Sequence, residues 1–152
     1  MKKYLGILVI ALILLTGCGE KETIKICKST NEDTINGYRL DAEYKIYSKG
    51  DIVEKVEIKE VVISESQELL DYFEAYLQNT YSSINEAFGG YENKVTKENL
   101  KVTSNTTINY NEMDIAKFVK ENKESKNFIN NDNKVLLESL INSYEKLGAI
   151  CK

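Results

Sequence analysis

The feature that most restricts the fold is a strict alternation of side chains over residues 38–47. Side chains suited to burial stand at even positions and charged side chains at odd positions: Tyr38, Leu40, Ala42, Tyr44 and Ile46 against Arg39, Asp41, Glu43 and Lys45. Successive side chains of a β-strand point to opposite faces of its sheet. The pattern therefore predicts a half-buried strand of an antiparallel sheet.

Further strands are expected on both sides of this segment. Residues 23–28 alternate, and Asn36-Gly37 is typical of a tight turn between strands. Residues 52–63 form a third expected strand after a turn at Lys49-Gly50. Glu60 interrupts its apolar face, which predicts a bulge or a partly exposed strand end.

Helical spacing of apolar residues begins after Ser64. Ser64 and Gln67 have the spacing of a capping box, so we expect a helix over 65–88 that Gly89-Gly90 stops. Residues 91–96 and 100–110 predict two more strands, and Asn111 is expected to cap a short helix. Asp132 or Asn133 is expected to cap a last helix, which Gly148 ends.

The expected order is β-β-β-α-β-β-α with one short helix inserted. Short turns between strands imply antiparallel pairing, and two amphipathic helices can cover one face of the sheet. The chain has 152 residues, which is enough for one domain. We therefore expect a single-domain α+β protein with its helices packed on one face of an antiparallel sheet.

The N-terminus has the pattern of a secretory signal. Lys2 and Lys3 precede an apolar run that is too short to span a bilayer, and Leu15-Thr16-Gly17-Cys18 follows it. These four residues resemble a bacterial lipobox, which implies cleavage before Cys18 and a lipid (diacylglycerol, palmitate-type) anchor on its thiol. The alternative is an ordinary signal, or a short anchor, with an incidental cysteine.

This interpretation of the N-terminus divides the chain into three parts. Residues 1–17 form the signal peptide, residues 18–22 the lipidated cysteine with a tether of about 10–15 Å, and residues 23–152 the domain. The location is then the cell membrane, on its extracytoplasmic face, with the lipid as anchor. Cleavage leaves 18 of the 20 basic residues against 24 acidic ones, a net charge of −6, which gives no reason to bind nucleic acid.

Two cysteines remain in the expected mature chain, Cys27 and Cys151. An extracytoplasmic location permits a disulfide, so we expect them to pair and tie the first strand to the C-terminus. Free buried thiols are one alternative, and a redox pair is the other. A redox pair usually has a C-x-x-C spacing, which this chain lacks.

The arrangement resembles the YehR-like family of small bacterial lipoproteins. The resemblance lies in the lipobox at Cys18, the strand pair 38–47 and 52–63, the following helix, the late strand that ends in residues 107–110, and a closing helix. It implies the same fold and location. The family has no established activity, so the resemblance assigns no catalytic residue.

Several groups of polar residues are candidates for a functional site. Asn130-Asn131-Asp132-Asn133 lacks the ligand spacing of a calcium loop, and is expected to be a loop with a helix cap. Acidic pairs at Glu54/Glu57 and Glu65/Glu68 could serve a glycosidase only across a cleft, and are expected to be solvated. Six tyrosines could line a groove or an interface, although most are expected at the core boundary: Tyr38, Tyr44, Tyr72, Tyr76, Tyr81 and Tyr110.

The function classes follow from what the chain contains. It has no histidine, and it has no nucleophile motif and no glycine-rich phosphate loop, so we expect no enzyme and no cofactor or metal. The first hypothesis is a binding or interaction module of the cell envelope, with an exposed apolar patch or an unpaired sheet edge. The alternative is a small carrier of an apolar ligand, a lipid or peptide, with an apolar cavity; a hydrolase comes third.

Overall fold

The structure, a computed structural model, describes residues 21–152. The predicted signal peptide and Cys18 lie outside the described residues. The elements in chain order are β1 (Glu22–Asp33), β2 (Tyr38–Lys49), β3 (Ile52–Ser64), α2 (Gln67–Phe88), β4 (Tyr91–Glu98), β5 (Lys101–Asn109), α3 (Ile115–Glu121), the 3-10 helix η2 (Lys123–Asn127), β6 (Val135–Leu136), α4 (Leu137–Lys146) and β7 (Ile150–Cys151).

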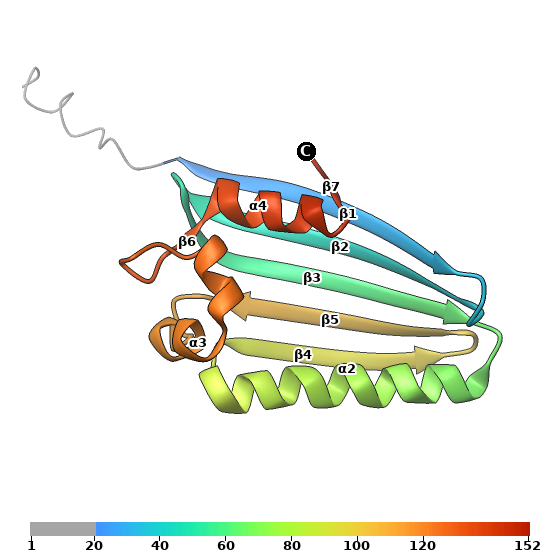
Figure 1. The fold of residues 1–152 in the computed structure, drawn as a ribbon. Helices are drawn as coiled ribbons and strands as arrows, with labels where there is room; N and C mark the ends of the chain where they lie inside the picture. The colour runs from blue at the N-terminus through green and yellow to red at the C-terminus, as the bar shows by residue number, and fades with distance from the viewer. Residues whose placement is uncertain (1–20) are drawn as a thin grey trace, which may run out of the picture.

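All seven strands form one antiparallel sheet, as Figure 1 shows. The strand order is β4-β5-β3-β2-β1-β7, and β6 pairs with the first two residues of β3. The predicted α+β fold and its antiparallel sheet are confirmed. The two-residue strands β6 and β7 were not predicted, and β1 begins at Glu22, one residue inside the expected tether.

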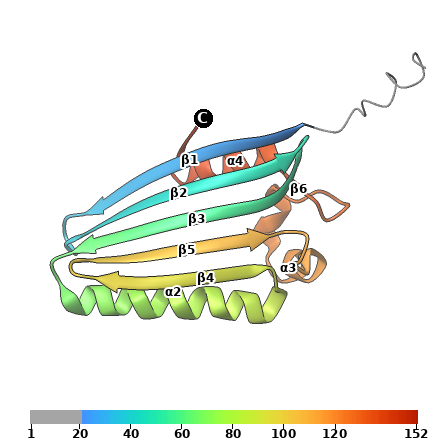
Figure 2. The same cartoon turned by 180° about the vertical axis from the view of Figure 1, so that it is seen from behind.

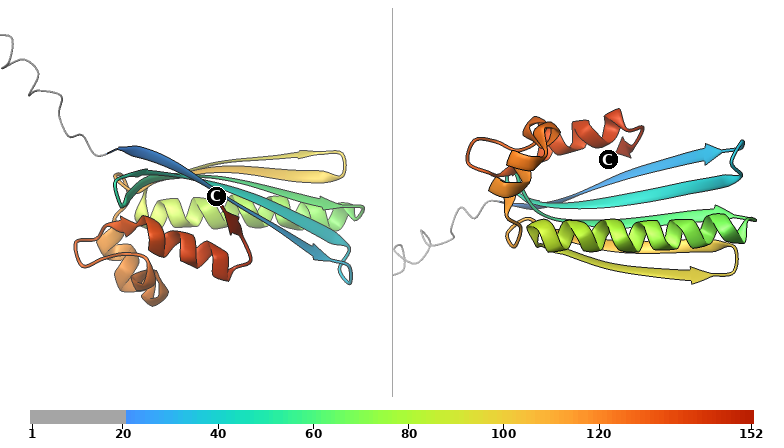
Figure 3. Two further views of the ribbon diagram at one scale, coloured as in Figure 1. Left: turned by 90° about the horizontal axis from the view of Figure 1, so that it is seen from above. Right: turned by 60° about the horizontal axis from the view of Figure 1, so that its bottom comes forward.

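The helices cover one face of this sheet. Val56, Ile58 and Val62 alternate along β3 on that face and are buried. Figures 1 and 2 show α2 and α4 on the same side of the strands, and Figure 3 shows the twist that separates the two helices. The other face is polar and carries ion pairs such as Lys28–Glu43 between β1 and β2 and Lys55–Glu57 along β3, each at 2.7 Å.

The bulge lies at a different place from the one predicted. Lys55 pairs with Tyr47 and Val53 pairs with Ser48, so Glu54 is the extra residue of β3. The extra residue turns Val53 and Val56 to the same buried face. Glu60 is regularly paired, and its side chain lies on the helix-covered face.

The long helix α2 begins two residues later than the capping box suggested. Its cap is Ser66, whose Oγ accepts a hydrogen bond from the Leu69 N–H at 3.3 Å. The Ser64 Oγ instead donates to the Gly37 carbonyl at 2.7 Å and accepts from the Ser66 N–H at 3.1 Å. Ser64 therefore ties the end of β3 to the β1–β2 turn and does not cap the helix.

Gly89-Gly90 ends α2 as predicted. Both residues have positive φ, and a Cβ on Gly90 would stand 2.6 Å from the Asn109 carbonyl oxygen. Such a contact would force backbone to move, so this joint requires glycine at position 90.

The last two predicted caps are wrong. Asp114 caps α3 by accepting from the Lys117 N–H, in place of Asn111. Residues 135–136 pair with β3, so α4 begins only at Leu137 and has no side-chain cap at all. After Asp132 the chain first forms strand β6 of the sheet, and the helix α4 begins only after that strand.

Candidate interaction surface and buried polar row

The outer edge of β1 is paired over a short stretch only. Among residues 21–152, β7 is its partner on that side, with Cys27 opposite Cys151 and Lys28 opposite Ile150. Ile26 and Lys152 add two backbone hydrogen bonds, at 2.9 and 3.2 Å. The β1 backbone on both sides of this contact is an open sheet edge.

Three isoleucines are exposed at this edge. Ile24 is 57% exposed, Ile26 37% and Ile150 71%. They lie on the polar face of the sheet because Cys27, one position away, points to the helix-covered face and is fully buried. An exposed apolar group therefore lies beside an open sheet edge.

An open hollow of about 790 Å³ lies along the same edge. We call the residues that line it the edge surface: Ile24, Ile26, Lys28, Ser29, Thr30, Gly148, Ile150 and Lys152. A second, smaller hollow of about 300 Å³ lies at the far end of the sheet, near the exposed Ile63 and Leu100. Both hollows are open to solvent and neither is an enclosed cavity between sheet and helices.

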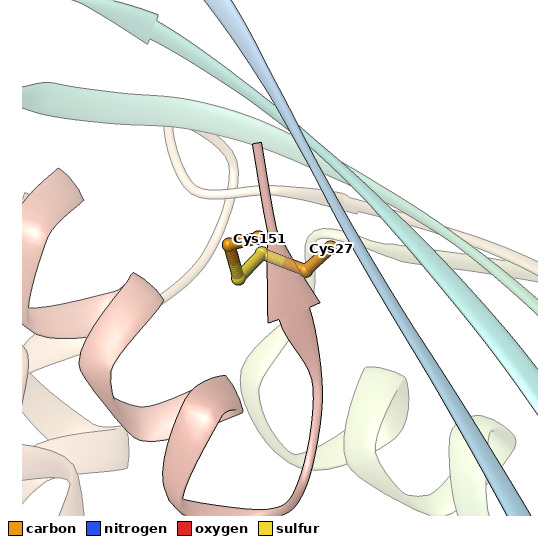
Figure 4. The surroundings of a disulfide bond; sticks show 2 residues. All are labelled: Cys27 and Cys151. Atoms are coloured by element: carbon orange, nitrogen blue, oxygen red, sulfur yellow. A yellow bond between two sulfur atoms is a disulfide. The ribbon is translucent and has the colours of Figure 1, made fainter.

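Cys27 and Cys151 lie side by side, as expected from the sequence. Figure 4 shows their sulfur atoms joined between β1 and β7, and the two Cα atoms are 4.0 Å apart. The neighbouring pair Ile26–Lys152 carries the hydrogen bonds, so the cysteines occupy the closer, non-hydrogen-bonded position of an antiparallel pair. This contact fixes the C-terminus to the sheet edge.

Most of the six candidate tyrosines belong to the core or its boundary. Tyr44 stacks on Tyr144 with ring centroids 4.3 Å apart, and Tyr110 packs against the core below α4. Tyr38 packs under α2, and Tyr81, which belongs to α2, packs against the same cluster from the helix side. Only Tyr72 and Tyr76 are exposed, 60% and 51%, one turn apart on the outer surface of α2. The tyrosines thus form no continuous groove.

A row of polar side chains crosses the helix-covered face and was not predicted. The Tyr81 hydroxyl donates to the Glu60 carboxylate at 2.7 Å, and burial raises the pKa of that carboxyl. On the neighbouring strands, the hydroxyls of Ser104 and Thr106 donate to the Asn93 Oδ1 at 3.0 and 3.1 Å. The sequence signal for this row is the interruption at Glu60, which predicts a bulge or a partly exposed strand end; the structure shows neither there and largely buries the Glu60 side chain.

The tyrosines around Glu60 are held in the protonated form. Burial, and then the nearby Glu60 charge, raise the pKa values of Tyr81 and Tyr44. Burial also raises the pKa of Tyr144. These phenols can donate hydrogen bonds at neutral pH but cannot act there as bases.

None of the other candidate residues lines the edge surface, although Glu54 shares a neighbouring hollow with Ile24. Asn130 Oδ1 accepts from the Asp132 and Lys134 N–H groups, so this side chain organises its own loop. Glu57 binds Lys55 and the Tyr47 hydroxyl, and these hydrogen bonds lower its pKa. In the part of the chain that the structure describes, no three His, Cys, Asp or Glu side chains group as a metal site would require.

None of the helices within residues 21–152 has the length and apolar character needed to cross a membrane.

Comparison with known proteins gives structural matches alone. No protein-family model and no curated protein sequence matches the chain. It is similar to the NMR structure of the E. coli YehR protein, a structural genomics target, with a TM-score of 0.57, 19% identity, and coverage of 88% of this chain and 92% of that chain. It is also similar to the NMR structure of a protein from Streptococcus pneumoniae TIGR4, with a TM-score of 0.49, 17% identity and coverage of 87% and 86%.

The first of these similarities extends over nearly the whole described domain. At 19% identity it concerns the fold and carries over no activity or site. The sequence resemblance to the YehR-like family is thereby confirmed at the level of structure: this chain has the fold of the YehR protein.

Proposed function

We propose that this chain is a lipoprotein anchored through Cys18 to the extracytoplasmic face of the cell membrane. The observation that carries this proposal is the order of a basic start, a short apolar run and Leu15-Thr16-Gly17-Cys18. The position of Cys27 beside Cys151 supports it, because disulfides persist in oxidising compartments.

We propose further that the domain is a non-enzymatic binding or interaction module whose contact surface is the edge surface. The exposed Ile24 and Ile150 and the open edge of β1 support this role. The absence of histidine from the sequence supports a function without acid–base catalysis near neutral pH.

Anchoring is tested by the mass of the mature protein. The full chain is extracted from membranes of cells that express it, and its intact mass is compared with that of a Cys18→Ala variant. We expect cleavage before Cys18, an added diacylglycerol, and loss of both in the variant. An unmodified Cys18 would contradict the proposal.

The contact surface is tested by a photo-crosslinking residue placed at Ile24 and, as a matched control, at Ile63. Both are exposed isoleucines on the polar face of the sheet, 57% and 40% exposed. We expect an adduct with one envelope component from position 24. Adducts from position 63 alone would move the contact surface to the far end of the sheet.

A second candidate function, a small carrier of an apolar lipid or peptide, is favoured by the hollow of about 790 Å³ and its isoleucines. Native mass spectrometry of the gently purified full chain tests it. A carrier would retain one apolar ligand per chain and lose it in Ile24→Asp. If the chain retained no ligand besides its own lipid anchor, the carrier function would be excluded and the interaction module would remain the proposed function.

A further inference from the structure

The edge surface lies within reach of the proposed lipid anchor. Cys18 and Glu22 are four residues apart, a span of at most about 14 Å, and Ile24 lies two residues further along β1. Figure 1 shows the start of β1 and the C-terminus at the same edge of the sheet. Acyl chains on Cys18 would therefore hold this edge close to the lipid headgroups.

The side chains of the edge surface suit a membrane interface. Its isoleucines are accompanied by Lys28 and Lys152, and no Asp or Glu side chain lines this hollow; Glu22 and Glu54 line a neighbouring hollow that shares Ile24. Lys28 is exposed and paired with Glu43, and Lys152 and the nearby Lys21 and Glu22 are exposed as well. Apolar side chains next to lysines are typical of surfaces that lie in the headgroup region.

The other surface near the anchor is polar. The loop 130–134 lies at the same end of the sheet, because Leu137 donates to the Asp51 carbonyl and Gly50 donates to the Lys21 carbonyl. Asn131, Asp132 and Asn133 are exposed on that loop. A domain tethered at this corner buries more apolar surface against lipid by lying on the β1 edge than by standing on the loop.

We propose that the edge surface is a membrane-contacting surface, on which Ile24, Ile26 and Ile150 lie among the headgroups of the bilayer that carries the anchor. This rests on the proposed lipidation of Cys18. It names the bilayer itself as the partner of the edge surface and orients the opposite edge of the sheet, which is β4, away from the bilayer.

The chain has no tryptophan, so one introduced tryptophan is an unambiguous reporter. We would compare Ile150→Trp with Leu100→Trp, because Leu100 is 54% exposed in the β4–β5 turn, at the edge of the sheet opposite β1. Each full-length, lipid-carrying variant is placed in vesicles of phosphatidylcholine and phosphatidylglycerol with brominated acyl chains. Mass spectrometry first establishes that Cys18 carries its lipid.

We expect the emission of Ile150→Trp to shift to the blue and to be quenched by the bromines, and that of Leu100→Trp to remain unchanged. Absence of quenching at position 150, or equal quenching at both positions, in lipid-carrying protein would overturn the membrane contact and leave the anchor standing. A protein without lipid on Cys18 would overturn both proposals together.

Discussion

Two apolar clusters lie on the same face of one sheet, and they are stabilised in different ways. The cluster under α4 includes Ile46, Val56 and Leu140 and ends at Cys27. The cluster under α2 is smaller and consists of Val62, Leu70, Leu77 and Val102 with their neighbours. The disulfide between Cys27 and Cys151, which joins distant parts of the chain, lies at the first cluster. The second cluster is covered by the packing of the long helix α2.

The polar row marks the boundary between the two clusters. Along β3, Ile58 belongs to the cluster under α4 and Val62 to the cluster under α2, with Glu60 between them. Along β5, Ser104 and Thr106 stand between Val102 and Ile108 in the same way. The face is therefore two cores that share a sheet, and each should respond separately to substitution.

Removal of the disulfide should produce the largest effect. The cysteines are 124 residues apart, so the double variant Cys27→Ala/Cys151→Ala should lose up to about 4–5 kcal/mol of unfolding free energy by the chain-entropy relation. Urea unfolding measures the loss, and hydrogen exchange should place the loosened amides in α4 and β7. Two thiols titrating in the unreduced, denatured wild type would contradict the pairing.

Truncation in the other cluster should be the next largest. Leu70 is fully buried under α2, so Leu70→Ala should cost about 3 kcal/mol, with exchange increased in α2 and β4. Leu147→Ala is the matched control, because Leu147 is 78% exposed at the end of α4. Similar losses from both substitutions would mean that the α2 cluster is not a packed core.

The strands and the helix-covered face could be predicted because both follow from the local period of the side chains. The alternation over 38–47 matches the register of β2 against β1 and β3. The helix caps could not be predicted in this way. Whether Ser64 or Ser66 caps α2 depends on the Gly37 carbonyl, which binds Ser64 and is 27 residues away from it in the chain.

The edge surface and the polar row likewise could not be predicted from local sequence patterns. The strand β7 has two residues, and its place beside β1 becomes evident only once Cys151 lies opposite Cys27. Glu60 broke the expected pattern, but its burial depends on Tyr81 of α2, which donates to it across the helix–sheet interface.

The cap of α2 gives a smaller effect that tests the correction. Ser66→Ala removes the acceptor of the Leu69 N–H and should cost about 1 kcal/mol. Ser83→Ala, at an exposed position inside the same helix, should be neutral or slightly stabilising because alanine has the higher helix propensity. If the two substitutions had equal effects, Ser66 would not be the cap.

Glu60→Gln should give the smallest change at any one pH, because glutamine can still accept the Tyr81 hydrogen bond, but that change should depend on pH. Burial raises the pKa of Glu60 in the fold, so folding favours its neutral form. The stability that this group contributes is complete below its unfolded pKa and is lost as the pH rises through its folded pKa. The variant should therefore gain stability relative to wild type as the pH rises above the ordinary carboxyl range.

Tyr81→Phe provides the matched test in the opposite direction. The hydroxyl lowers the pKa of Glu60 by donating to its charged form, so its removal should make the total loss of stability at high pH larger and extend it to higher pH. In the double variant Glu60→Gln/Tyr81→Phe that pH-dependent part should disappear. Urea unfolding between pH 4 and 8 measures all four proteins, and parallel curves would mean that the boundary between the two clusters carries no buried charge.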